Sequence, residues 1–411
     1  MPPQETPGGV DRSRMRSAAA VLTSMTALAA MSLVAGPAVA ESRGGPCALT
    51  RTGAHHSLGL DTWNRAYPKP ERTLRAVMVF LSFPDHAPAV TPDELAADYF
   101  PTTSEFFERA SYGRFHLVPY PQKTWVRMPH PSVRYGIRRD WAPENRAAYL
   151  RDAVAAADPG VDFSAYDVVY FVADPNAPGV DSDATKVVNF ERPLRADGTD
   201  LRRIVTVFEK HPPDRNVLAH ETGHVFDLPD LYHRPTDGKG DWDTYVGDWD
   251  VMGSQFGMAP DLFAWQKWKL GWLDRAQVDC VRSGTSLHTL QPLSQTPKPG
   301  GTGGTRLAVI RTGQGSAIAV EARGSVGNDG DTCSEGVLVY RVRNEASSGG
   351  GPIEVLDGHP RSEACWDRSV YPALADAPLE VGETFTVPGE RITIEVADRT
   401  QSGAYTVKIT T

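Results

Sequence analysis

Two histidines and a glutamate stand at a spacing that suits metal binding and hydrolysis. His220, Glu221 and His224 form the pattern H-E-x-x-H. On a helix the two histidines are one turn apart and share a face, so two neutral imidazoles can reach one zinc ion. Glu221 then lies beside the metal, where its carboxylate can accept a proton from zinc-activated water. The motif predicts a hydrolytic zinc site, against the alternative of a helix with two solvated histidines.

A zinc site of this kind needs a third protein ligand and one open position for water. Asp230 lies six residues after His224, beyond a Leu-Pro pair. A helix that ends near Asp227 would let the chain turn and bring Asp230 back to the metal, and the proline favours such an end. Asp227 is a second candidate, because on an unbroken helix it shares a face with the histidines. His233 is a third candidate, and we expect Asp230 to be the ligand.

Several neighbouring residues are expected to position this motif. Asp214 follows two prolines and is predicted to cap the N-terminus of the helix. Met252 lies within Trp-Asp-Val-Met-Gly, which suits a buried methionine in a tight turn. The tryptophans at 265, 268 and 272 are at helical spacing, which favours the core face of a helix over a binding platform.

Two further groups of side chains near the motif have open roles. Tyr232 and Tyr245 are candidates to stabilise a developing oxyanion, and a structural role for each is equally open. A group of aspartates follows the motif, and hard oxygen ligands close together suit calcium, although the spacing matches no EF-hand. A calcium site and a solvated acidic loop, with Asp250 fixing the turn around Met252, both stay open. The candidate calcium ligands are Asp237, Asp241, Asp243 and Asp248.

Longer stretches around these residues resemble a known family. HETGHVFDLPDLY at 220–232, GDWDVMG at 247–253 and PDLFAWQKWKLGW at 260–272 are similar to the immune-inhibitor-A-like branch of bacterial metallopeptidases, within the metzincin group. The upstream FLSFPD and SYGRF and the downstream VEARG and GVLVYRVR match the same pattern. The resemblance extends from about Leu74 to the C-terminus.

This resemblance implies roles for single residues. It implies His220, His224 and Asp230 as zinc ligands, Glu221 as the catalytic base and Met252 as the Met-turn residue beneath the metal; relatives often carry calcium as well. The chain departs from the family at Asp227, where the family usually has a glycine that leaves the helix with positive φ. Aspartate tolerates that region better than most residues, at a cost of about 1 kcal/mol, so the turn can survive.

Charge and composition narrow the classes of partner. The 411 residues carry a net charge of −9, so no broad basic field is available for nucleic acid or an anionic membrane surface. An apolar fraction of 40% and a charged fraction of 23% are ordinary for a globular protein. The charge therefore disfavours nucleic acid as a partner. From the motif and the resemblance we expect protein or peptide substrates, and we also expect a monomer.

The N-terminus has the pattern of a secretory signal peptide. Arg12, Arg14 and Arg16 precede an apolar run over 18–35, and Ala38-Val39-Ala40 supplies a small-x-small cleavage site. An uncleaved membrane anchor is the alternative, but the run is short for a bilayer span. We expect a secreted, extracellular protein with no membrane span after cleavage.

Four cysteines follow the signal peptide, and an even count in an exported chain favours two disulfides. A bond between Cys333 and Cys365 would stay within the C-terminal region, which leaves Cys47 to pair with Cys280. That choice among three pairings rests on position alone. A free Cys47 thiolate that blocks the zinc is the alternative.

The pattern of elements predicts an α+β fold. Buried strands are expected at 76–81, 168–172 and 204–208, short β-prone pieces within 112–128, and helices at 93–109 and 144–157. Beyond Asp274, short apolar stretches between Gly-rich and Pro-rich turns predict an antiparallel β-sandwich-like domain. These stretches lie at 306–311, 317–322, 337–342, 384–387, 391–396 and 404–409, with a loop over 297–304.

The expected organisation has four parts. They are a signal peptide at 1–40, an irregular leader at 41–70, a metzincin-like mixed α/β catalytic domain at 71–275 and a β-domain at 276–411. The predicted function is a secreted zinc endopeptidase. A catalytically silent binding module of the same fold, acting at the cell surface, is the main alternative. A zinc hydrolase acting on a non-protein substrate is a third possibility.

Overall fold

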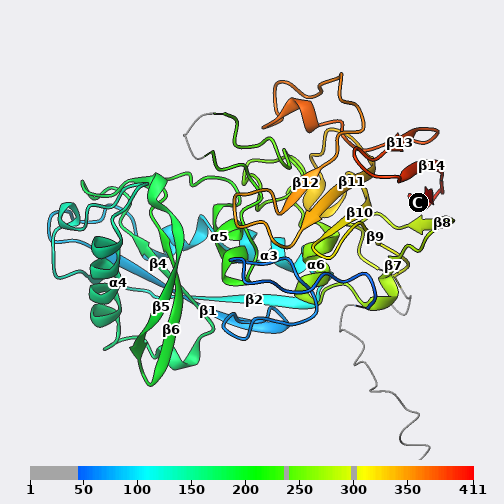
Figure 1. The fold of residues 1–411 in the computed structure, drawn as a ribbon. Helices are drawn as coiled ribbons and strands as arrows, with labels where there is room; N and C mark the ends of the chain where they lie inside the picture. The colour runs from blue at the N-terminus through cyan, green and yellow to red at the C-terminus, as the bar shows by residue number, and fades with distance from the viewer. Residues whose placement is uncertain (1–44, 236–239, 298–302) are drawn as a thin grey trace, which may run out of the picture. The chain divides into compact units, whose positions relative to one another are not determined.

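The computed structural model describes residues 45–235, 240–297 and 303–411. The described residues belong to one compact unit with an α+β fold, rich in strands and with few helices (Figure 1). The predicted signal peptide and most of the predicted loop at 297–304 lie outside the described residues. Within the described ranges, no helix combines the length and the apolar character needed to cross a bilayer.

The first sheet has the strand order β2-β1-β4-β6-β5, with β3 also paired to β1. All its pairings are parallel except that between β5 and β6. The predicted strands at 76–81, 168–172 and 204–208 are confirmed as β1, β4 and β6, and the β-prone region 112–128 contains β2 and β3. The strands are β1 (Arg72–Ser82), β2 (Phe115–Pro121), β3 (Val126–Arg127), β4 (Val168–Ala173), β5 (Lys186–Ala196) and β6 (Thr199–Val207).

Helices cover both faces of this sheet. Alternate residues of β1 point to opposite faces, so Met78 and Phe80 join one hydrophobic cluster and Val77 and Val79 join another. The second cluster includes the buried face of α4 (Pro143–Ala157), which corresponds to the helix predicted at 144–157. The first includes α3 (Thr102–Ala110) and α5 (Val217–Val225). The helix with the zinc-type motif is therefore packed against a sheet face built from strongly apolar strands.

One predicted helix is divided in the structure. The region 93–109 contains α2 (Pro92–Ala97) and α3, with Pro101 directly before α3. A proline has no N–H to donate and its ring clashes with the preceding turn, so a helix cannot run through this position undisturbed. Thr91 and Glu94 form a reciprocal capping box at the start of α2.

Two further sheets form the region after residue 275. One has the order β12-β11-β10-β9-β7 and the other the order β13-β14-β15-β8. All their pairings are antiparallel except that between β7 and β9. The strands are β7 (Val278–Cys280), β8 (Thr285–Leu290), β9 (Leu307–Arg311), β10 (Ser316–Arg323), β11 (Gly336–Arg343), β12 (Ile353–Val355), β13 (Thr384–Thr386), β14 (Thr393–Arg399) and β15 (Tyr405–Thr410).

The five-stranded sheet is buried on both faces. Ile318 and Val320 face a cluster that includes Ile394 and Val407 of the four-stranded sheet. The opposite face, with Ala317 and Ala319, joins the same cluster as α5 and α6 (Ala264–Leu270). Each of the six predicted strand stretches overlaps a strand, whereas the short β7, β8 and β12 were not predicted.

Short 3-10 turns occur in both parts of the chain. They lie at Ser132–Tyr135, Phe163–Ala165, Ser182–Ala184, Arg275–Gln277, Gly327–Asp329 and Pro372–Leu374.

The segment from 45 to 70 contains no helix or strand, as predicted, yet it is firmly attached. The indole of Trp265 donates to the carbonyl of Leu58 at 2.9 Å, and that of Trp272 donates to the carbonyl of Pro70 at 2.8 Å. Together with Trp268 these tryptophans belong to the core, as predicted, although Trp272 lies beyond the end of α6. We call this segment the leader below.

Both disulfides have the predicted pairing. Cys47 is bonded to Cys280, and Cys333 is bonded to Cys365. The first bond joins the leader to β7. The alternative in which Cys47 is a free thiolate beside the metal is therefore wrong for this structure, because its sulfur is already bonded.

Candidate metal site

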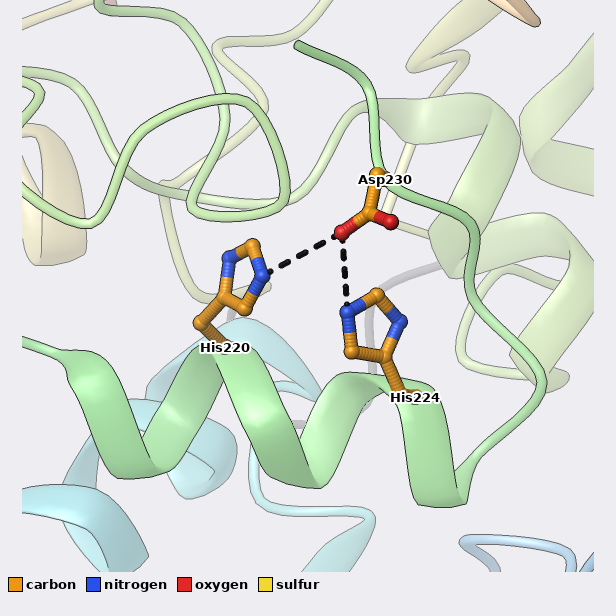
Figure 2. A group of neighbouring side chains, drawn as sticks. All are labelled: His220, His224 and Asp230. Carbon is orange, nitrogen blue, oxygen red and sulfur yellow. Dashed lines mark ion pairs between the residues drawn. The ribbon is translucent and has the colours of Figure 1, made fainter. Parts of the chain in front are cut away.

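Three side chains converge at the end of α5 (Figure 2). Oδ1 of Asp230 lies 3.0 Å from Nε2 of His224 and 3.5 Å from Nε2 of His220. The ligand atoms of the three residues all lie within 4.8 Å of one another. Within the described ranges, no other group of three His, Cys, Asp or Glu side chains converges in this way. The structure thus brings together the three residues that the sequence predicts as metal ligands.

The motif lies on a short, fully buried helix. All nine residues of α5 are buried, and His220 and His224 are one turn apart on the face that meets Asp230. The predicted cap is wrong: Asn216, with a φ of 58°, occupies the N-cap position. The Asp214 carboxylate instead accepts a hydrogen bond from Gln255 Nε2 at 2.9 Å. The left-handed residue at 216 starts the helix later than the Pro-Pro-Asp pattern indicated.

The other ring nitrogen of each histidine is engaged by the backbone. His220 Nδ1 lies 2.7 Å from the carbonyl of Val251, and His224 Nδ1 lies 2.8 Å from the carbonyl of Leu228. A carbonyl only accepts, so each Nδ1 carries the proton and, in the neutral ring, each Nε2 offers a lone pair. This arrangement is the one that metal-binding histidines adopt, and the residues present therefore fit a zinc ion.

The Asp230 carboxylate controls the charge of this group. Burial disfavours a charged His224, but Asp230 outweighs burial and raises the pKa of His224 to about 9. Burial would likewise raise the pKa of Asp230, yet the two imidazoles hold that pKa well below its ordinary value. A cation that binds here must displace the His224 proton, because only the neutral imidazole is a ligand.

The chain reverses directly after α5. Phe226 is the C-cap, and Asp227 adopts a φ of 64°, the left-handed conformation that aspartate tolerates better than most residues. The N–H of Leu228 donates to the carbonyl of Gly223 at 3.1 Å, which closes the turn. The predicted helix end near Asp227 is confirmed, and the reversal is what returns Asp230 to the histidines.

The Asp227 side chain points away from the candidate ligands into a buried ionic cluster. Its carboxylate is fully buried and lies 2.7 Å from Arg51 Nη1, 3.0 Å from His56 Nδ1 and 3.3 Å from Lys269 Nζ. Lys269 also donates to the backbone carbonyl of Asp227. Asp227 is therefore not among the converging ligand atoms, and its carboxylate is neutralised by the leader and by α6.

Two leader histidines reach the site without any pattern in the sequence to indicate it. The His56 ring stacks on the His224 ring, with centroids 5.6 Å apart and planes 22° apart. Burial lowers the pKa of His56 to about 3, so the ring is neutral near pH 7 and its Nδ1–H donates to Asp227. His55 lies next to it and lines the cleft described below.

Glu221 lies where a base is required. Its side chain is buried and lines the cleft, and its Oε2 accepts a hydrogen bond from the N–H of Val187 at 2.6 Å. Burial raises the pKa of Glu221 above the ordinary value for a glutamate, although His220 and His224 oppose the shift. Val187 belongs to β5, so the edge strand that was not predicted fixes the orientation of this carboxylate.

Met252 packs beneath the motif helix. It is fully buried, and a Cβ at Gly223 would lie 2.4 Å from its sulfur, so only glycine allows this close approach. The N–H of Met252 donates to Asp250 Oδ1 at 2.8 Å, and the N–H of Phe263 donates to Asp250 Oδ2 at 2.8 Å. Asp250 therefore fixes the turn around Met252, as the sequence suggested.

Of the remaining residues that the sequence proposed for the site, some line the cleft and others do not. Tyr232 lines the cleft and stacks with His220, with centroids 6.3 Å apart. Tyr245 and His233 pack against each other, and neither joins the converging ligand atoms. Among the acidic residues, Asp237 lies outside the described part of the chain. Asp241, Asp243 and Asp248 form no converging group within that part, and Asp248 accepts hydrogen bonds from the backbone N–H groups of Met258 and Val370.

A cleft of about 710 Å³ opens over the site. It is lined by the three candidate ligands and Glu221, by leader histidines, and by residues near the start of β5. One lining residue comes from the C-terminal region: Ser348, whose hydroxyl lies 2.8 Å from Asp230 Oδ2. Its position in a Gly-rich loop gave no indication of this contact.

Comparison with known proteins identifies no relative. No protein-family model matches the chain, and no curated protein matches it.

The Asp227 cluster leads to a stability prediction. Asp227→Asn keeps the shape and the tolerance of positive φ but removes the charge, which leaves Arg51 and Lys269 without their buried counter-charge. We expect the free energy of unfolding to fall by about 3 kcal/mol, measured by urea denaturation with the disulfides intact. The control is Asp61→Asn. The half-exposed Asp61 carboxylate accepts a hydrogen bond from the N–H of Arg51 at 2.7 Å, and its change should lower the free energy of unfolding by about 1 kcal/mol or less. Equal losses in the two variants would contradict the role of the cluster.

Proposed function

We propose that the protein is a secreted zinc-dependent endopeptidase. The observation that carries the proposal is the convergence of His220, His224 and Asp230 in a cleft that also contains the buried carboxylate of Glu221. Three protein ligands with a cleft on their open side are typical of a catalytic rather than a structural zinc site. The resemblance to immune-inhibitor-A-like metzincins leads to the same chemistry.

The proposed mechanism assigns separate tasks to the side chains. His220, His224 and Asp230 would hold the zinc ion, which when bound supplies Lewis acidity that makes water a stronger acid and polarises a carbonyl. Glu221, held by the N–H of Val187, accepts the proton of the attacking water and returns it to the leaving amine. Its raised pKa favours that exchange, because a carboxylate with a higher pKa is the stronger base. Tyr232 lies close enough to the histidines to be a candidate donor to the oxyanion.

The proposed catalytic domain at 71–275 does not make up the cleft alone. The leader contributes His55 and His56, and the β-sandwich-like domain proposed at 276–411 contributes Ser348. The two disulfides suit an oxidising, extracellular environment, which agrees with the proposed secretion. A calcium site in the acidic stretch after the motif stays a sequence-based proposal.

A catalytically silent binding module at the cell surface is the alternative function. It would keep the fold and the metal but would not need a base. The feature against it is the buried carboxylate of Glu221 beside the candidate ligands, because binding alone does not require a base there.

The metal proposal predicts a difference between two neighbouring aspartates. Wild-type protein should hold about one zinc ion per chain, and Asp230→Ala should lose most of it because the third ligand is gone. Asp227→Asn is the matched control and should keep its zinc, because that carboxylate faces Arg51, His56 and Lys269 instead. Metal content after dialysis, measured by mass spectrometry, tests this. Retention by Asp230→Ala together with loss from Asp227→Asn would assign the third ligand to Asp227.

The catalytic proposal predicts that Glu221→Gln keeps its zinc but loses proteolysis. Removal of the base should lower the rate of casein cleavage by at least about 100-fold, and a chelator should abolish the wild-type activity. Glu209→Gln is the control, since that carboxylate also lines the cleft but lies outside the converging ligands. Undiminished cleavage by zinc-loaded Glu221→Gln would rule out the mechanism. A wild-type protein that binds zinc but cleaves no protein would favour the binding module.

A further inference from the structure

The loop that follows β11 runs beside the segment that contains Asp230. The N–H of Gly349 donates to the carbonyl of Asp230 at 3.0 Å, and the N–H of Arg234 donates to the carbonyl of Gly349 at 3.0 Å. Gly349 has a φ of 74°, and a Cβ there would lie 2.9 Å from the Cβ of Arg234, so a glycine is needed for this approach. Two regions more than 100 residues apart in sequence thus pair along their backbones next to the candidate metal site.

Ser348 contacts Asp230 from this loop at two atoms. Its hydroxyl donates to Asp230 Oδ2 at 2.8 Å and accepts from the backbone N–H of Asp230 at 2.8 Å. The other carboxylate oxygen, Oδ1, is the atom that faces both histidines. The two oxygens of Asp230 therefore have different partners, and the hydrogen bond to Oδ2 fixes which oxygen is presented to the histidines.

The loop is itself held in place at its beginning. The carbonyl of Asn344 accepts hydrogen bonds from Thr52 Oγ1 at 2.7 Å and from Ser57 Oγ at 3.1 Å, and the Asn344 side-chain amide donates to the carbonyl of Thr50. Ser348 is thus presented from a segment anchored to the leader. Asp230, by contrast, lies in a stretch without helix or strand, where its own backbone would leave the side chain several rotamers.

We propose that Ser348 is a positioning residue for the third metal ligand, which rests on the metal site proposed above. Hydrogen bonds to a ligating carboxylate orient it before the metal arrives, and their loss typically weakens metal binding. Sequence position gives no hint of this role, because Ser348 is one of two adjacent serines before three glycines.

The test compares the two serines by zinc affinity, measured by competition with a chromogenic chelator on the whole chain. Ser348→Ala should weaken zinc binding about 10- to 100-fold, and Ser348→Thr, which keeps the hydroxyl, should recover most of the affinity. Ser347→Ala is the control and should bind zinc as the wild type does, because within the described residues its hydroxyl has no hydrogen bond to a candidate ligand. The urea midpoint of each metal-free variant checks that the fold is intact.

The outcomes separate this inference from the function on which it rests. Zinc affinity unchanged in Ser348→Ala, with normal binding in the wild type, would overturn the role of Ser348 and leave the metal site standing. A wild-type chain that binds no zinc would overturn both. Equal weakening in Ser347→Ala and Ser348→Ala would show that the loop acts only as a whole and would contradict a specific hydroxyl.

A second feature, independent of Ser348, is a group of basic side chains in the cleft. Arg139, Arg146, Lys186 and Arg234 all line it together with Glu221. They come from four places in the chain: the region before α4, α4 itself, the first residue of β5 and the segment after the metal motif. The sequence alone does not indicate that these four side chains line the same cleft.

In the described part of the chain none of these four side chains forms an ion pair with a carboxylate, although Glu221 and Asp140 act on Lys186 from a greater distance. Lys186 Nζ donates to the carbonyl of Arg139 at 2.7 Å, and the Arg139 guanidinium lies 4.9 Å from the ring centre of Trp242. Burial, and then the nearby charge of Arg146, lowers the pKa of Lys186. Arg234 acts in the same direction, and the carboxylates of Glu221 and Asp140 oppose the shift. The exposed Asp183 also lines the cleft but forms no ion pair with this group.

The geometry points to a subsite for a carboxylate of the peptide substrate, formed by Arg146, Lys186 and Arg234, and this inference rests on the peptidase function proposed above. An anion placed between these groups would relieve their mutual repulsion and form charge-assisted hydrogen bonds. Lys186 directly precedes Val187, which contacts Glu221, so the subsite lies close to the position of the reacting bond. The carboxylate could belong to an Asp or Glu side chain or to the C-terminus of the peptide.

Binding measurements test this without relying on cleavage. Labelled peptides that differ only in Glu or Gln at one position, each with a free or an amidated C-terminus, are titrated into zinc-loaded Glu221→Gln protein and followed by fluorescence anisotropy. The Glu peptide should bind about 10-fold more tightly than the Gln peptide, and the added changes Arg146→Gln and Lys186→Gln should remove that preference. Arg192→Gln, an exposed β5 residue outside the cleft, is the control and should keep it.

Each outcome has one meaning for the subsite. A preference for Glu that disappears with the two changes assigns the carboxylate to a side chain. A preference for the free C-terminus that disappears in the same way assigns it to the peptide end, and the proposed endopeptidase would then be a carboxypeptidase-type enzyme. Equal binding of all four peptides, or a preference unaffected by Arg146→Gln and Lys186→Gln, overturns the inference.

Discussion

The arrangement of the site depends on one left-handed turn, at which the buried residue is an aspartate. Asp227 ends the motif helix with a φ of 64°, and this reversal returns Asp230 to His220 and His224. A buried carboxylate is unfavourable without compensating charge, so the turn is stable only where cations and donors surround it. Arg51 and His56 from the leader and Lys269 from α6 provide them. The geometry of the metal site therefore rests on contacts made well outside the motif.

The same constraint explains why distant parts of the chain share one core. The hydrophobic cluster around α5 includes leader residues such as Leu49 and Leu58, the tryptophans of α6 and one face of the five-stranded sheet. The disulfide from Cys47 to Cys280 and the indole of Trp265 hold the leader against this core. Since the leader then supplies His56 and the C-terminal loop supplies Ser348, the cleft is complete only when all three regions are folded together.

Local patterns predicted more of the site than of its surroundings. The spacing of His220, His224 and Asp230 determines their convergence, because helix geometry and a proline-assisted helix end act over a few residues. Long apolar runs likewise predicted β1, β4 and β6. The edge strand β5 was missed because its residues are mostly polar and part-exposed, and Asn216 was missed as the cap because a left-handed residue is not marked by the sequence. Contacts such as Ser348 with Asp230 depend on how separate sheets pack, which no periodicity in one segment encodes.

Asp227 also shows how the residue type at one turn changes what the rest of the chain must do. A glycine at this position would adopt positive φ without steric cost and without charge. Aspartate adds backbone strain and a buried charge, so it is tolerated only with partners already in place. Those partners come partly from the leader, and the turn that carries the third candidate ligand is thereby coupled to leader packing. Removal of the leader contacts would leave Lys269 as the only cation beside the Asp227 carboxylate. The turn from Phe226 to Asp230 would then be the first segment to lose its conformation.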